Sequence, residues 1–214
     1  MSKSPFRDKQ EAAFYSEFGR ALALWAVLES ALCDWFIRVT KMRPDMATDV
    51  FYSARNFVGR SEMLEAAMGA TKLPSIEERL LKAAIRKAVA YNSFRNSLAH
   101  GRTIHRFSRG EDGRPVRGQW LLVPGQSKFS PRTHGHSIEA IRNAAKNFSE
   151  LASLLSEAYY HLEFAWQNDI EFLSPEECLE RVHALPNQAD LATPSRRQLG
   201  RQRQRQAAQK KAPQ

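Results

Sequence analysis

The sequence predicts an all-α protein, an up-down bundle of four long helices with a β-hairpin inserted between the third and the fourth. Three observations support this prediction. Apolar residues recur at helical spacing through four long segments. Residues 103–136 lose that spacing and show short strand-like runs around a Gly-rich turn. The chain has 214 residues, 43% of them hydrophobic, which is enough for one domain with a substantial core.

The first predicted helix spans residues 9–40 and ends before Pro44. Glu29 falls inside its apolar stripe, and an unpaired buried carboxylate is costly. We therefore expect Glu29 to be buried and bonded to an arginine, with Arg55 and Arg95 as the candidates. A structural role for this carboxylate is favoured over a catalytic one.

Capping signals and apolar spacing define the remaining helices. The sequence predicts a second helix over 46–68 with a stop at Gly69, a third over 75–100 opened by a capping box at Ser75-Ile76-Glu77-Glu78, a fourth over 137–166 with Ser137 as N-cap, and a short fifth announced by Ser174-Pro175-Glu176-Glu177. We expect a helical domain over 1–170, with the hairpin as an insert at 103–136, then a short helical extension over 171–190 and a basic tail over 191–214.

The insert is predicted to be a hairpin with strands at 103–107 and 116–123 and a turn at 110–113. It carries an excess of arginines and begins directly after the third helix, so we expect it to overhang the end of that helix. Such a surface favours an anionic ligand, although ordinary solvated arginines are an alternative. The candidate residues for binding such a ligand are Arg102, Arg106, Arg109 and Arg117.

Positive charge is concentrated at the end of the chain. The formal net charge is +9, and residues 195–214 supply +7 of it without a single acid, which leaves +2 for residues 1–194. The tail alternates Arg and Gln, so we expect it to be disordered. It would attract polyanions through counterion release, or serve only as a solubilising tail.

Several classes of protein are disfavoured. No apolar run has the length of a membrane span, and the first residues lack the apolar core of a signal peptide. Cys33 and Cys178 are expected to be free thiols in a reducing compartment, which indicates the cytoplasm. The pair His134 and His136 lacks accompanying ligands, so neither a metal site nor a cofactor is expected.

The third helix ends in a concentrated group of polar residues. Asn96 and His100 are four apart and share one face, and the long Arg95 side chain can reach the same patch. Gly101 suits the left-handed position that ends many helices. A cation beside a titratable imidazole suits phosphate chemistry. By spacing alone, however, the favoured interpretation is that Arg95 pairs with a carboxylate, Asn96 is solvated and His100 caps carbonyls.

This motif at the end of the third helix of an α-helical bundle resembles the HEPN superfamily (higher eukaryotes and prokaryotes nucleotide-binding). The signature there is an Arg, a polar residue, three variable residues and a His, matched here by Arg95, Asn96 and His100. The resemblance implies a metal-independent endoribonuclease that acts as a homodimer through the third helix, uses these three catalytic residues and leaves a 2′,3′-cyclic phosphate. RNA is then the expected ligand of the hairpin arginines. The resemblance also leaves open a non-catalytic RNA- or nucleotide-binding bundle, a toxin or antitoxin partner of a nucleotidyltransferase, or a purely structural interaction bundle.

Overall fold

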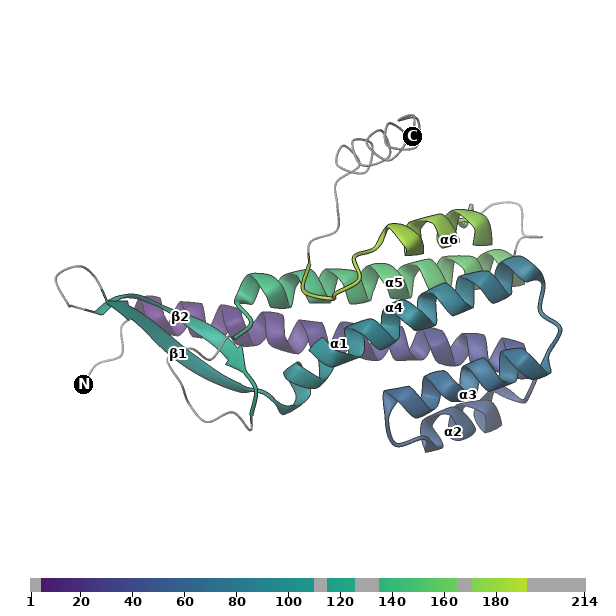
Figure 1. The fold of residues 1–214 in the computed structure, drawn as a ribbon, viewed down its shortest axis with the longest axis horizontal. Coiled ribbons are helices and arrows are strands. Elements are labelled where there is room, and N and C mark those ends of the chain that lie inside the picture. The colour runs from purple at the N-terminus through teal and green to yellow at the C-terminus, as the bar shows by residue number, and fades with distance from the viewer. Residues whose placement is uncertain (1–4, 110–114, 126–134, 165–170, 192–214) are drawn as a thin grey trace, which may run out of the picture.

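The computed structural model describes residues 5–109, 115–125, 135–164 and 171–191 (Figure 1). Within these ranges the chain forms six helices and one two-stranded antiparallel sheet, which confirms the mainly helical class and the hairpin. The elements are α1 (Pro5–Thr40), α2 (Pro44–Ser53), α3 (Phe57–Ala70), α4 (Ser75–His100), β1 (Arg102–Arg109), β2 (Pro115–Val123), α5 (Ile138–Phe164) and α6 (Pro175–Ala184).

Some predictions fall on residues outside the described ranges. The hairpin turn at 110–113 and the predicted end of the fourth helix at Trp166 are among them. The basic tail over 191–214 lies outside as well, except for Leu191.

The centre of the bundle lies between α1 and α5, which run side by side (Figure 1). Their apolar stripes meet there: the Trp25 and Phe148 rings lie 5.1 Å apart, and the Trp35 indole donates to the Leu155 carbonyl at 2.9 Å. Both indoles are almost fully buried. Removing this much apolar surface from water is the main source of the bundle's stability.

The predicted second long helix is wrong, because the chain folds into two short helices, α2 and α3, separated at residues 54–56. Asn56 adopts an extended conformation and its side chain accepts a hydrogen bond from the Gly59 backbone N–H at 2.8 Å. This N-cap starts α3 and prevents α2 from continuing. Gly69 does not stop the helix, since α3 runs on to Ala70. The described residues therefore contain three long helices, α1, α4 and α5, where four were predicted.

Glu29 is buried and bonded to an arginine, as predicted, but the partner is Arg60 rather than Arg55 or Arg95. The Arg60 Nη1 donates to Glu29 Oε1 at 2.7 Å. The break before α3 explains the difference, because it turns Arg60 toward α1 and leaves Arg55 exposed in the connection.

The hairpin packs against the N-terminal half of α1 (Figure 1). The Trp120 ring lies 6.5 Å from Phe14 and 6.3 Å from Tyr15. The hydroxyls of Tyr15 and Thr103 are 2.7 Å apart, and Leu122, opposite Thr103 in the sheet, is buried in the core. The face of the hairpin that carries Thr103, Trp120 and Leu122 is thus the one that packs on the bundle.

Two similar sequence patterns behave differently at their helix starts. At α6 the predicted capping box forms: Glu177 N–H donates to the Ser174 hydroxyl at 3.3 Å, and Ser174 N–H donates to the Glu177 carboxylate at 3.0 Å. At α4 the predicted box is absent, because the preceding proline takes the N-cap position and Ser75 caps nothing. The Glu78 carboxylate, which would have closed that box, bonds Lys82 instead.

The helix α6 packs on α4 and α5, and its buried side chains Cys178 and Val182 belong to the same core as theirs. Both cysteines are buried and unpaired. In the described part of the chain, every helix is too short or too polar to cross a lipid bilayer.

Candidate functional site

The motif singled out in the sequence occupies the last two turns of α4. Phe94 and Leu98 are buried in the core, and this fixes the rotation of the helix about its axis. Asn96 and His100, one turn apart, consequently lie exposed on the opposite face, as the spacing predicted.

Arg95 lies half-buried at the edge of this exposed face. Its Nη1 donates to Asn96 Oδ1 at 3.3 Å, while its Nε is buried and has no hydrogen-bond partner in the described residues. No carboxylate in this part of the chain pairs with it, so the alternative in which Arg95 forms a structural ion pair is not supported there. An unsatisfied buried donor costs about 1–3 kcal/mol.

His100 is the last residue of α4, and its imidazole forms no hydrogen bond or ion pair with the described residues. The alternative in which the His100 side chain caps the last carbonyls is not supported in the described residues, because the imidazole bonds none of them; the Ser97 carbonyl accepts from the Gly101 N–H at 2.8 Å. The imidazole is exposed to solvent one turn beyond the Asn96 side chain. It is therefore accessible to a ligand.

Gly101 is not in the predicted left-handed conformation: its φ is −75° and its ψ is 165°, so the chain passes directly from α4 into the extended β1. Crowding explains the glycine instead. A Cβ at this position would lie 2.3 Å from the Ser97 carbonyl oxygen and 2.6 Å from Leu122 Cδ1. At Gly125, just after β2, a Cβ would lie 2.3 Å from the His100 carbonyl oxygen. The close contacts at Gly101 and Gly125 thus hold the end of α4 against the base of the hairpin.

The hairpin arginines are only partly gathered at the motif. Arg102 follows Gly101 directly and is exposed, and Arg106 lies further along β1 and is half-buried; both make contacts within the protein. Arg109 lies in β1 and Arg117 in β2. The hairpin runs from the end of α4 along α1, so its base adjoins the motif and its far half does not overhang it (Figure 1).

One neighbour of the motif was missed as a site residue. His136 extends the sheet by a backbone bridge to Leu122, and its ring stands edge-on against Phe94, 4.5 Å between centroids. Its Nδ1 lies 3.8 Å from the Asp190 carboxylate. Burial lowers the pKa of His136, and Asp190 opposes that shift only in part. No sequence signal links positions so far apart along the chain.

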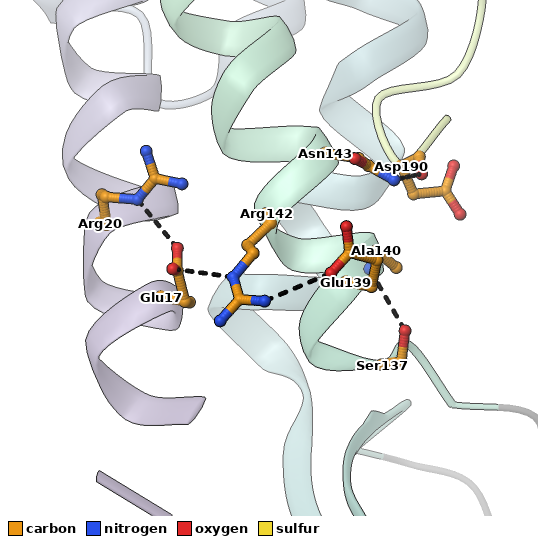
Figure 2. Close-up of polar contacts among 8 residues, drawn as sticks. All are labelled: Glu17, Arg20, Ser137, Glu139, Ala140, Arg142, Asn143 and Asp190. Carbon is orange, nitrogen blue, oxygen red and sulfur yellow. Dashed lines mark hydrogen bonds and ion pairs between the residues drawn. The ribbon is translucent and has the colours of Figure 1, made fainter. Parts of the chain in front are cut away.

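A polar cluster fixes the start of α5 against α1 near this end of the bundle (Figure 2). Glu17 accepts from Arg142 at 3.0 Å and from Arg20 at 2.9 Å, and Arg142 also bonds Glu139. Burial favours a higher pKa for Glu17, but the arginine hydrogen bonds outweigh it and hold that pKa below its usual range. Ser137 caps α5 as predicted, accepting from the backbone N–H three residues on, at 3.2 Å. These arginines are neutralised by carboxylates and are poor candidates for anion binding.

The exposed face of α4 is basic as it leads toward the motif. Arg79, Lys82 and Arg86 are exposed along it, and Lys82 is neutralised by its ion pair with Glu78. The face then continues through uncharged residues, among them the exposed Val89, Ala90 and Ser93, to His100. An anionic polymer bound along the exposed face of α4 would meet these cations before it reaches the motif.

Among the described residues, no three His, Cys, Asp or Glu side chains gather closely enough to hold a metal ion. Comparison of the chain with models of protein families, with curated proteins and with solved structures found no match.

Proposed function

We propose that this protein is a metal-independent endoribonuclease of the HEPN type, with Arg95, Asn96 and His100 as its catalytic residues. One observation carries the proposal: at the end of α4, an arginine and an exposed imidazole lie together, and among the described residues neither has an ion-pair partner. A site of this composition suits transfer of protons beside a phosphate.

The chemistry requires three tasks. A base removes the proton of the ribose 2′-hydroxyl, whose oxygen then bonds to the adjacent phosphorus. The bond from phosphorus to the 5′-oxygen breaks, and an acid gives that oxygen a proton. A cation stabilises the charge that develops on the phosphorane oxygens. The products are a 2′,3′-cyclic phosphate and a 5′-hydroxyl.

The side chains match these tasks. Histidine titrates near neutral pH and can carry out either proton transfer, which assigns that role to His100. Arginine offers a planar fork of donors to phosphate oxygens, which makes Arg95 the transition-state clamp. Asn96, already bonded to Arg95, positions the guanidinium or a phosphate oxygen.

A single His100 supplies only one of the two proton-transfer groups, so the proposal includes a homodimer through α4. The exposed stretch before the motif contains Ala90 and Ser93, small residues that allow two helices to approach closely. A two-fold pair of α4 helices would bring two copies of His100 to one phosphate. The buried, unpaired Cys33 and Cys178 suit the reducing cytoplasm as the place of action.

The test is cleavage of single-stranded RNA by the purified protein in EDTA, with the chemical ends of the products determined. Cyclic phosphate and 5′-hydroxyl ends are expected. His100→Ala should slow cleavage by about 10²–10⁴, the usual effect of removing a general acid–base group. Arg95→Lys should also fail, because an ammonium does not reproduce the planar fork.

Matched controls lie on α6, where His183 and Arg181 are exposed. His183→Ala and Arg181→Lys should cleave as the wild type does. Absence of cleavage by the wild-type dimer, or full activity of His100→Ala, would make a non-catalytic RNA-binding bundle the better account.

A further inference from the structure

Asn92 lies on α4 one turn before Asn96 and two turns before His100, on the same stripe of the helix. The residue is half-buried, and its Oδ1 atom is buried without a hydrogen-bond partner in the described residues. A buried acceptor is ordinarily bonded to a donor or to water, because leaving it unpaired is destabilising. The unpaired carbonyl of Asn92 therefore requires an explanation.

A second unpaired atom lies close by on the same helix. The Arg95 Nε–H, three residues further on, is a buried donor without a partner in the described residues. In α4, which the structure describes from end to end, Asn92 Oδ1 and Arg95 Nε are the two buried side-chain atoms in this state. Residues three apart are neighbours on a helix surface, and long side chains lean toward the helix N-terminus, so Arg95 extends over the turn that carries Asn92. The acceptor and the donor thus complement each other.

The guanidinium of Arg95 is held only at its outer end. Its Nη1 donates to Asn96 Oδ1 at 3.3 Å, which is long for a bond from an N–H group to an oxygen. This bond occupies one of the two nitrogens that form the planar fork toward a phosphate. A bond from Nε to Asn92 would instead fix the plane of the guanidinium from the side of its stem and leave both Nη1 and Nη2 for the phosphate oxygens.

We propose that Asn92 is a positioning residue for Arg95: when a phosphate of RNA occupies the site, Asn92 Oδ1 accepts from Arg95 Nε and holds the guanidinium fork toward the phosphate. This inference rests on the proposed function for the identity of the ligand. Nη1 then leaves Asn96, whose amide turns to a phosphate oxygen. Catalytic hydrogen bonds are often long or misaligned in a free protein and tighten when the substrate binds, which accounts for the unpaired atoms in the free structure.

This role has a signature that a structural asparagine lacks. Asn92 Oδ1 contributes no hydrogen bond to the free protein, so Asn92→Leu, of similar size, removes a buried acceptor without breaking a bond to it. The variant should melt at or above the wild-type temperature. Its kcat for RNA cleavage in EDTA should nevertheless fall by about 10–100-fold, the effect of losing a hydrogen bond to a charged group. KM should stay nearly constant, because the fork acts on charge that develops in the transition state.

Two further variants separate positioning from folding. Asn92→Asp keeps an oxygen acceptor for Arg95 Nε and should retain most of the activity. Asn143→Leu is the matched control, because Asn143 is also a half-buried asparagine of a long helix, but its amide donates to the Asp190 carbonyl at 3.2 Å. This control should melt below the wild type and keep the wild-type kcat.

An NMR readout follows the Arg95 Nε–H without any need for cleavage. Its signal is assigned by its loss in Arg95→Lys. The probe is a 2′-O-methyl RNA oligonucleotide, which has no free 2′-hydroxyl and therefore binds without being cut. Binding should move the Nε–H signal downfield and slow its exchange with water in the wild type and in Asn92→Asp, but not in Asn92→Leu.

The inference is overturned if Asn92→Leu cleaves with the wild-type kcat, or if Asn92→Asp loses as much activity as Asn92→Leu. It is also overturned if the Nε–H signal of the wild type does not respond to the oligonucleotide, or responds equally in Asn92→Leu. An enzyme that cuts RNA equally well with leucine at position 92 would retain the proposed function and lose this inference. A protein without nuclease activity whose Nε–H signal responds only when residue 92 offers an acceptor would do the reverse.

Discussion

Replacing Glu29 by alanine removes one partner of a buried ion pair and leaves the other, Arg60, without its carboxylate. The two side chains are 11% and 17% exposed, and Nη1 lies 2.7 Å from Oε1. Breaking a buried pair from one side costs about 3–5 kcal/mol. Arg60 keeps the Ala54 carbonyl at 3.3 Å and the Tyr52 ring at 4.9 Å, so the expected loss is at the low end, about 3 kcal/mol.

Thermal unfolding followed by circular dichroism measures this loss. For a domain of this size each kcal/mol lowers Tm by about 2–4 °C, so Glu29→Ala should melt about 6–12 °C below the wild type. Glu62→Ala, which removes an exposed carboxylate from α3, should change the stability by less than about 0.5 kcal/mol.

The double variant Glu29→Leu with Arg60→Met removes both charges and should recover most of the stability, because no uncompensated ion remains. The reasoning would be refuted if Glu29→Ala melted with the wild type. It would also be refuted if Arg55→Ala proved as damaging as Arg60→Ala, since the stranded charge would then be the wrong arginine.

Two further outcomes are expected from the motif end of the bundle. Gly101→Ala should lower the free energy of unfolding, measured in urea, by about 1–3 kcal/mol, because the new methyl group collides with Leu122. Gly19→Ala is the control: no atom lies within 4 Å of the added Cβ, so it should stabilise α1 by about 0.5–1 kcal/mol. Equal stabilities of the two variants would contradict the crowding at Gly101. Because the folded-state pKa of His136 is lowered, the unfolded chain binds more protons in mild acid, so stability should fall as the pH drops below about 6.5 and level off below the folded pKa. His136→Asn should lack this part of the pH dependence in urea midpoints measured across that range, and parallel profiles would rule it out.

Apolar spacing alone located α1, α4 and α5, because each of these helices buries one continuous stripe against its neighbours. The hairpin was located by the loss of that spacing, since residues 102–109 pair with residues 115–123 over an apolar surface of α1. The break between α2 and α3 was missed because Phe51, Phe57 and Leu64 are all buried, so the apolar positions alone did not reveal that Asn56 begins a new helix.

The candidate site could be predicted from the sequence only in part. The spacing of Asn96 and His100 was enough to place both on one exposed face. The conformation of Gly101 was not predictable, because it depends on Leu122 reaching it from β2. The path of residues 185–191 after α6 gave no sequence signal, since it is fixed by Lys87, Tyr91 and Asn147 side chains elsewhere in the chain that bond their backbone.

The direct joint between α4 and β1 limits how this chain can change length during evolution. With Gly101 alone between the last helical residue and the first strand residue, the joint has no slack. Side chains alternate between the two faces of a strand, so one residue gained or lost there would exchange the faces of β1. Thr103 would turn away from Tyr15, and Arg102 would be pressed toward the bundle. Length variation should therefore collect at the far turn of the hairpin, while the joint beside His100 keeps its length.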